Sequence, residues 1–376
     1  MIKKLVCMLF LFFTIFTYIE AKEMSLEQEL GKALFFDKNL SLNRTQACAS
    51  CHNPEFGFTD NRDNGVKSMA SLGDNLKSLG DRIAPTASYA KFSPPFHYDE
   101  KKKKYIGGQF WDGRASSLEL QAQGPPLNPD EMGIPNIKTF VERVKENSYY
   151  INSFKEIYGN DIFNEDKNAY EAFSKAIASF EKSDEFSPFD SKYDRYLKDE
   201  YDLSPLEDLG KALFFSNNNN SCASCHVLKG EDKEGETFTN YEYHNIAVPQ
   251  NKELRAINGA KNIDNGLLNN PEVRDEKEKG KFKVPTLRNV AVTAPYMHNG
   301  VFKDLKTVVL FYDKFNNSER VINPETNKAW EEAEIDENIS KEELKAKKLS
   351  DRKVEALVAF MKLLTDKKYE HLIEEK

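Results

Sequence analysis

The chain has 376 residues, a formal net charge of −8 and a charged fraction of 30%. This length is sufficient for two ordinary domains, and an acidic balance argues against nucleic acid as a partner. Lys3 and Lys4 precede the apolar run at residues 5–19, and Ala21 offers a small residue for cleavage. Because the run is shorter than the roughly 20 residues of a membrane span, it predicts a secretory signal peptide, with an uncleaved anchor as the alternative. We expect residues 1–21 to be removed on export to the periplasm, which leaves no membrane span in the mature chain.

Two blocks of sequence occur twice. LGKALFF stands at residues 30–36 and again at 209–215, and CASCH follows at residues 48–52 and again at 222–226. The apolar residues of LGKALFF are spaced for one face of a helix, and each block runs through a polar loop into its CASCH. The repetition predicts two like units in tandem, separated by the charged, Pro-containing stretch 183–206.

We place one domain at residues 22–185 and a second at residues 186–376. Further helices are expected at Ile137–Ile157 and Asn168–Lys182. A last helix, which could pack back on the first domain, is predicted by a stripe of apolar residues at i, i+3, i+4 and i+7: Val354, Leu357, Val358, Met361 and Leu364. Strand patterns are few, so the predicted fold is mostly α with long loops.

The positions of the cysteines indicate what kind of site the repeated motifs form. Cys7 leaves with the signal peptide, and the other four cysteines all lie in the CASCH motifs. Disulfides, redox chemistry or half a zinc site would use C-x-x-C, but none of these explains the histidine that follows each pair. C-x-x-C-H is the attachment motif of c-type haem, in which the thiols bind the vinyl groups and the histidine binds iron. The sequence therefore predicts two tandem cytochrome c-like domains with two covalent haems, held by Cys48, Cys51 and His52 and by Cys222, Cys225 and His226.

Three further motifs carry a resemblance to a family. They are FWDGR at residues 110–114, NPDEM at 128–132 and PTLRNVAVTAPYMHNG at 285–300. Together with the repeated blocks, they resemble the bacterial dihaem cytochrome c peroxidases, a family that includes the MauG-type methylamine-utilisation enzymes. The resemblance implies an exported peroxidase that reduces hydrogen peroxide to water with electrons from a small c-type cytochrome or a similar donor. It also implies a homodimer, a peroxide site at the N-terminal haem and an electron-transfer role for the second haem.

The resemblance assigns three further residues to the chemistry. Trp111 would lie between the haems on the electron path, and Gln121 and Glu131 match the amide and the acid of the peroxide pocket. A positioned carboxyl can move a proton between the peroxide oxygens, which typically gives roughly 10²- to 10⁴-fold in rate. From composition alone, Trp111 would be a buried aromatic residue and Glu131 a solvated surface acid.

The remaining histidines indicate an open first haem. Some family members hold a histidine over that haem until the other haem is reduced, but no histidine lies between His52 and His97 here. The first haem should therefore react without reductive activation. His97, in the apparent insertion FSPPFHYDEKKKKY, is a weak substitute and more simply an exposed loop histidine. His244 and His298 occupy positions near the second haem, where they would hold propionates or loops, and His371 lies in a charged tail.

Two residues compete as the sixth ligand of the second haem. Met297 is the obvious thioether, but the family pattern places the ligand fourteen residues after His298, at Tyr312. MauG-type members have tyrosine at this place, and peroxidases of the activated type have methionine. An anionic phenolate stabilises ferric iron, so this ligand would lower the haem potential. The alternative for Tyr312 is a buried core residue on an amphipathic helix.

The same resemblance raises a calcium site between the domains. Thr293 and Pro295 match the residues whose carbonyls bind calcium in the family, but Ile83 replaces the asparagine that provides a side-chain oxygen. Calcium is therefore in doubt.

Two other functions remain open. A MauG-type enzyme would use peroxide to oxidise side chains of a protein partner, and Tyr312 and the missing distal histidine both agree with that function. A non-enzymatic dihaem electron carrier would need no peroxide pocket, so Gln121 and Glu131 argue against it.

Overall fold

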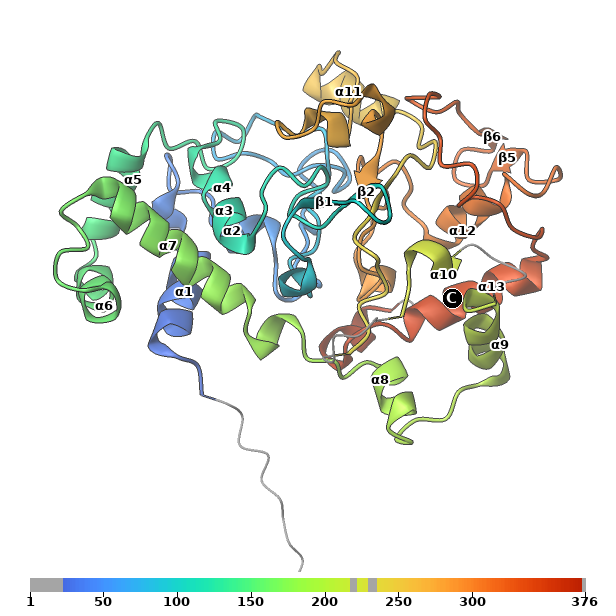
Figure 1. Ribbon diagram of the computed structural model, residues 1–376, viewed down its shortest axis with the longest axis horizontal. Helices are drawn as coiled ribbons and strands as arrows, with labels where there is room; N and C mark the ends of the chain where they lie inside the picture. Colours follow the sequence, from blue (N-terminus) through green and yellow to red (C-terminus); the bar gives the residue numbers. More distant parts are fainter. Residues whose placement is uncertain (1–22, 217–221, 229–234, 374–376) are drawn as a thin grey trace, which may run out of the picture.

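The computed structural model describes residues 23–216, 222–228 and 235–373, and the predicted signal peptide lies outside them (Figure 1). As predicted, the described chain is mostly helical, with long loops. Its α-helices are α1 (Leu26–Phe36), α2 (Cys48–Cys51), α3 (Leu118–Ala122), α4 (Gly124–Leu127), α5 (Ile137–Lys145), α6 (Ser148–Tyr158), α7 (Asp166–Glu181), α8 (Lys192–Leu197), α9 (Pro205–Phe214), α10 (Cys222–Cys225), α11 (Lys252–Asn258), α12 (Leu305–Asp313) and α13 (Asp351–Lys362).

The described residues also form three short antiparallel hairpins and several 3-10 turns. The hairpins pair β1 (His97–Asp99) with β2 (Lys104–Ile106), β3 (Tyr243–His244) with β4 (Phe282–Lys283), and β5 (Ile322–Asn323) with β6 (Lys328–Ala329). In the second hairpin Tyr243 lies opposite Lys283 and His244 opposite Phe282. No helix among the described residues is long and apolar enough to cross a membrane.

The repeated LGKALFF blocks form two equivalent helix pairs. Helix α1 packs on α7, and α9 packs on α13. A Cβ atom on Gly31 would lie 1.9 Å from the carbonyl oxygen of Ala176, and a Cβ on Gly210 would lie 1.9 Å from that of Ala356. Each helix pair therefore crosses at a point where only glycine fits. α7 and α13 are thus corresponding helices of the two halves.

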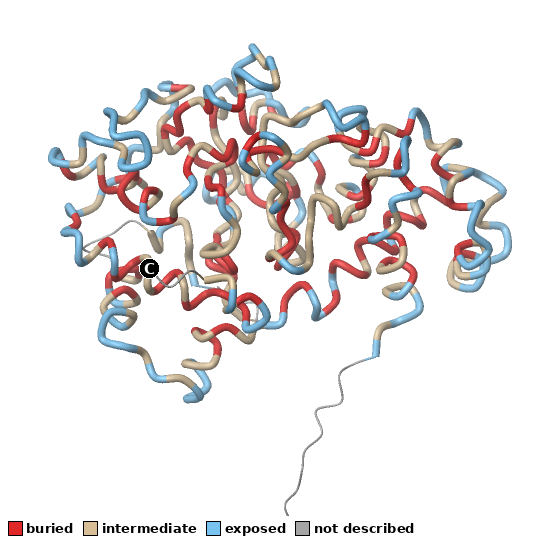
Figure 2. Tube along the Cα trace, turned by 180° about the vertical axis from the view of Figure 1, so that it is seen from behind, coloured by how far each residue is buried: buried red, intermediate tan, exposed pale blue. Residues whose placement is uncertain are grey.

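Two apolar cores lie beside these helix pairs, one drawn from residues 30–186 and the other from residues 193–364. The predicted boundary at residues 185 and 186 falls at the end of the first core. Figure 1 shows the two halves side by side, and Figure 2 shows buried backbone running along α7 and through the centre of the molecule. Two smaller clusters join the halves, one of which packs Phe96 of the first half with Tyr243 of the second.

The structure differs from the expectation at two places. The helix predicted at Ile137–Ile157 is two helices, because the Asn147 side chain accepts a hydrogen bond from the Tyr149 amide and starts α6. The C-terminal helix packs on α9 in its own half and not back on the first half. The segment after it makes that contact instead, where the Tyr369 hydroxyl donates to the Pro54 carbonyl at 2.8 Å.

Candidate functional site

The two CASCH motifs adopt the same local structure. Each forms a single helical turn, α2 or α10, and the amide of the following histidine donates to the carbonyl of the first cysteine at 2.9 Å in both copies. All four cysteines are free thiols of intermediate exposure. Two thiols and one imidazole therefore gather at the end of one turn in each half.

The histidines of both motifs are prepared as metal ligands in the same way. The Nδ1 atom of His52 lies 3.2 Å from the Phe58 carbonyl, and that of His226 lies 2.9 Å from the Phe238 carbonyl. Because a carbonyl only accepts, Nδ1 carries the proton and Nε2 keeps its lone pair, as a metal-binding imidazole requires. Burial lowers the pKa of both imidazoles, to about 4 for His226, so His226 is neutral at neutral pH.

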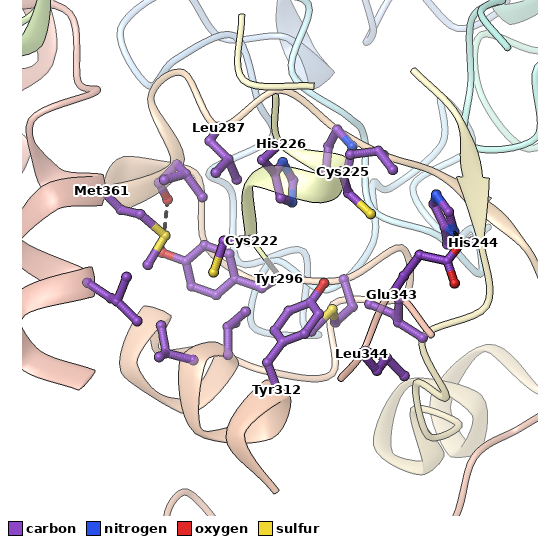
Figure 3. A pocket seen from close by; sticks show the side chains of 18 of the residues that line it. Cys222, Cys225, His226, His244, Leu287, Tyr296, Tyr312, Glu343, Leu344 and Met361 are labelled. Carbon is purple, nitrogen blue, oxygen red and sulfur yellow. Dashed lines mark hydrogen bonds and ion pairs between the residues drawn. The ribbon is translucent and has the colours of Figure 1, made fainter. Parts of the chain in front are cut away.

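A cavity of about 210 Å³ opens beside the second CASCH motif. Cys222, Cys225 and His226 line it from α10, and Tyr312 lines it from α12. Figure 3 shows the Tyr312 phenol pointing into the cavity toward the His226 side. Met297 lines the same cavity, so the structure brings both candidate sixth ligands to one place. The choice between them stays a prediction in favour of Tyr312.

The lining of this cavity fits a c-type haem. Most of it is apolar, as a porphyrin face requires, and free thiols and an imidazole nitrogen stand at one side. His244 and His298 also line it. The Nε2 atom of His298 is buried without a hydrogen-bond partner among the described residues, whereas that of His244 lies 3.6 Å from the Glu242 carboxylate. Buried polar atoms of folded proteins normally have partners, so the His298 nitrogen indicates a group that the polypeptide does not supply.

Near the first CASCH motif, the structure places Glu131 within electrostatic reach of both thiols. Its carboxylate raises the pKa of Cys48 and of Cys51, although burial is the larger cause for each. Burial also raises the pKa of Glu131 itself, and the Asn128 amide donates to its Oε1 at 2.9 Å. A carboxyl with a raised pKa is suited to giving and taking protons. Gln121 is half-buried on α3, and its side chain makes no hydrogen bond within the described part of the chain.

Trp111 stands in the wall between two cavities. It lines the cavity of the second CASCH motif and also a cavity of about 150 Å³ between the halves. Its indole nitrogen donates to the Ile83 carbonyl at 3.0 Å, and its carbonyl accepts from the Lys283 amide at 2.9 Å. The side chain is 9% exposed. Trp111 is therefore held by contacts with both halves, and its place on an electron path stays a prediction.

The residues predicted for calcium come together but do not suit the ion. Ile83, Thr293 and Pro295 all line the cavity between the halves. Calcium takes six to eight oxygen ligands, carboxylates prominent among them. No carboxylate lines this cavity within the described residues, and the Lys283 side chain does line it. This lining does not fit calcium.

The two other histidines lie on the surface. His97 is exposed on β1, where its Nδ1 contacts the Pro95 carbonyl at 2.8 Å, and His371 is exposed near the C-terminus.

Sequence reasoning missed two ionisable residues near these sites, the half-buried Lys283 and the buried Glu181. Lys283 lines both cavities. Glu181, at the end of α7, is 5% exposed and interacts electrostatically with Cys48. Lys283 could have been found from the sequence, because it is a lysine inside the otherwise apolar FKVPT segment. Glu181 gave no such signal, because an acid at a helix end is ordinary.

Comparison with known proteins decides the family. The methylamine utilization protein MauG of Paracoccus denitrificans is 46% identical over 352 residues, which cover 92% of this chain and 90% of that protein. The chain belongs to the dihaem cytochrome c peroxidase family. The family model for di-haem cytochrome c peroxidase matches residues 25–202. It follows that the protein is a c-type oxidoreductase with two covalently bound haems.

Other members of the family include peroxidases. The cytochrome c551 peroxidase of Nitrosomonas europaea is 31% identical over 283 residues, 75% of this chain and 71% of that protein. The crystal structure of the diheme peroxidase BthA from Burkholderia thailandensis matches with a TM-score of 0.82 at 28% identity, over 94% of this chain and 89% of that one. The family thus joins peroxidases and MauG proteins on one fold.

Proposed function

We propose that this dihaem enzyme reduces hydrogen peroxide to water at an open first haem, attached to Cys48 and Cys51 and bound by His52. Cys222, Cys225, His226 and Tyr312 would hold the second haem, which would supply electron transfer to the first. Each peroxide consumes two electrons and two protons and gives two waters. The electrons come from a small c-type cytochrome or a similar donor. The haems supply the redox chemistry when bound.

The polypeptide orients the peroxide, moves its proton and carries the electrons. The Gln121 amide donates a hydrogen bond to the peroxide, and the Glu131 carboxyl takes the proton from the near oxygen and delivers it to the leaving oxygen. The raised pKa of Glu131 supports this role, because it favours uptake of the proton from the near oxygen by the carboxylate before that proton is passed to the leaving oxygen. Trp111, which lines the cavity of the second CASCH motif and the cavity between the halves, would carry electrons toward the first haem.

Tyr312 is the observation that carries the proposal. Its phenol lines the cavity together with His226 and interacts electrostatically with both thiols of the motif, Cys222 and Cys225. Burial raises the pKa of that phenol when no metal is bound, so a cation in the cavity is what would favour the phenolate. A His226/Tyr312 haem would be closed to peroxide, which leaves the first site for the substrate.

Stopped-flow absorbance of the fully ferric holoprotein with one equivalent of hydrogen peroxide tests this assignment. The same mixture is then measured after one-electron reduction. A rapid Soret change in the ferric protein is expected, since no histidine lies between His52 and His97 to cap the first haem. Reaction of the half-reduced protein alone would mean that a hidden ligand covers the first haem and would make His97 the first suspect.

The second candidate is the MauG-type activity, peroxide-dependent oxidation of side chains in a protein partner. The 46% identity to a MauG protein over nearly the whole chain favours it. The two functions differ in their reductant, so the peroxide-treated protein is mixed with a reduced c-type cytochrome. Rapid oxidation of the cytochrome at two equivalents per peroxide supports the peroxidase. Slow oxidation, with a long-lived oxidised protein, supports the MauG-type activity.

Both functions place the protein outside the cytoplasm, where c-type haem is attached. We propose export to the periplasm with cleavage after Ala21, and a homodimer as the assembled state. Mass spectrometry of the mature N-terminus and light scattering of the holoprotein test these two points.

A further inference from the structure

Lys283 is a half-buried cation that has no anionic partner among the described residues. It lies on β4, and its ammonium donates to the Gly108 carbonyl. No ion pair of Lys283 occurs among the described residues. The carboxylate that acts on it electrostatically, Asp112, already binds Arg82 at 2.7 Å and Arg114 at 2.9 Å. The ammonium is therefore held by a single neutral acceptor.

Such an arrangement is costly in the folded protein. A charge removed from water is stabilised only when an opposite charge or several hydrogen bonds replace the lost hydration. Burial accordingly lowers the pKa of Lys283 to about 8. An anion within the cavity that Lys283 lines would remove this cost.

A second donor lies in the same corner of the cavity. His298 is stacked on Phe282, the neighbour of Lys283, with ring centroids 3.5 Å apart. Its Nε2 atom is buried without a partner in the described structure, and both residues line the cavity of the second CASCH motif. A neutral imidazole carries a proton on one of its two ring nitrogens, so the ring can donate one hydrogen bond. Two hydrogen-bond donors thus lack an anionic acceptor.

The chemistry of the expected occupant supplies that acceptor. A haem is an apolar macrocycle with two carboxylates on one edge, and a carboxylate inside a protein needs a cation or several donors. Lys283 and Lys347 are the lysines that line this cavity within the described residues, and Lys347 is exposed. His244 also lines it, but it already lies 3.6 Å from the Glu242 carboxylate. The corner formed by Lys283 and His298 is where a buried carboxylate is best accommodated.

We propose that Lys283 and His298 bind a carboxylate of the second haem, and that the charge of Lys283 raises the reduction potential of that haem. The inference rests on the assignment of the second haem to this cavity, which belongs to the proposed function. A fixed positive charge favours the state with one more electron. Because the Lys283 amide also binds the Trp111 carbonyl, the charge lies beside the electron path and acts on the haem from which electrons leave. Lys283 is a positioning residue and does not touch the peroxide.

Spectroelectrochemical titration of the holoprotein at pH 8 tests the proposal with Lys283→Met, Lys283→Gln and Lys283→Arg. Lys281→Met is the matched control. Lys281 lies two residues before Lys283 and has an anionic partner, Glu278, at 3.0 Å. In Lys283→Met and Lys283→Gln we expect the reduction equilibrium constant of the second haem to fall about tenfold, which is about 59 mV for one electron. Lys283→Arg and Lys281→Met should stay near the wild-type value.

The glutamine variant separates the two roles that Lys283 could have. Glutamine keeps a donor for the Gly108 carbonyl but has no charge, so a purely structural lysine predicts a wild-type potential for Lys283→Gln. Unchanged potentials in both uncharged variants would overturn the proposal. If Lys283→Met does not assemble with two haems, the potentials of Lys283→Gln and Lys283→Arg still show whether the charge at this position matters. Wild-type protein that fails to react with peroxide would refute the proposed function but leave the potential shift as evidence for the carboxylate contact.

Discussion

Tyr89 and Asn289 donate hydrogen bonds to the two oxygens of one carboxylate. The Tyr89 hydroxyl lies 2.6 Å from Oδ1 of Asp366, and the Asn289 amide lies 2.8 Å from Oδ2. Both donors have left-handed backbone conformations, at φ 61° and 62°, and each stands three residues after the threonine of a Pro-Thr pair. They are equivalent residues of the two halves. Asp366 therefore joins the two copies of the repeat at their corresponding points.

This shared carboxylate gives the first prediction. Tyr89→Phe should lower the free energy of unfolding by roughly 1.5–3 kcal/mol at pH 7, because a buried carboxylate loses one of its donors. Urea unfolding of the holoprotein, followed by circular dichroism, measures this loss. Tyr98→Phe is the control, since Tyr98 is 42% exposed and its hydroxyl has no hydrogen-bond partner in the described structure. Equal losses in the two variants would show that the contact with Asp366 contributes nothing specific.

Replacing the proposed proton carrier should slow the reaction with peroxide. Glu131→Gln keeps the size of the side chain and removes its acid–base function, so the second-order rate of the ferric protein with hydrogen peroxide should fall roughly 10²- to 10⁴-fold. Stopped-flow absorbance provides the rate. Asp130→Asn is the neighbouring control, since Asp130 is exposed, and it should react at the wild-type rate. A Glu131→Gln protein as fast as Asp130→Asn would exclude Glu131 as the proton carrier.

The competing sixth ligands can be separated by spectroscopy. Tyr312→Phe should convert the second haem from six-coordinate to five-coordinate, with a change in its electron paramagnetic resonance signal, whereas Met297→Leu should leave that signal unchanged. Tyr312→Met should raise the potential of this haem, because a neutral thioether stabilises ferric iron less than a phenolate does. Loss of the signal in Met297→Leu alone would assign the ligand to Met297 and contradict the His226/Tyr312 pair.

Glu181 predicts a pH dependence of stability. Burial raises its pKa from the model-peptide value of 4.5 to about 8, and its Oε2 atom has no hydrogen-bond partner among the described residues. A raised folded-state pKa means that the stability is full below pH 4.5 and is lost as the pH rises toward 8, because the unfolded chain loses the proton first. Glu181→Gln has no proton to lose at this position, so it avoids the loss of stability at higher pH. Relative to the wild type, the variant should gain stability between pH 5 and pH 8, by as much as about 4 kcal/mol.

Urea midpoints of the holoprotein across that pH range measure the gain. Glu171→Gln is the control on the same helix, since Glu171 forms only an exposed i,i+4 contact with Lys167 at 3.7 Å. A pH-independent difference between wild type and Glu181→Gln would mean that Glu181 is ionised in the folded protein.

Local sequence predicted the parts of the site that lie close together along the chain. CASCH brings its thiols and imidazole into one turn without help from distant residues, and the LGKALFF blocks predicted α1 and α9. Local sequence could not predict the wall between the two cavities, because that wall is formed by residues far apart in the chain. Trp111 was assigned by resemblance, but its partner Lys283 lies in a strand whose register is set by tertiary packing. The break at Asn147 was missed because the apolar spacing of a helix continues across it.

The wall of the second cavity has a consequence for the biogenesis of the enzyme. It is built from residues as far apart in the chain as Trp111 and Met361, and the last long helix contributes to it. The cavity can therefore close only when almost the whole polypeptide is available to fold, whereas the second CASCH motif lies well before the last part of that wall in the chain. Attachment of the haem has to precede closure, and the final helix then encloses a prosthetic group that is already covalently bound.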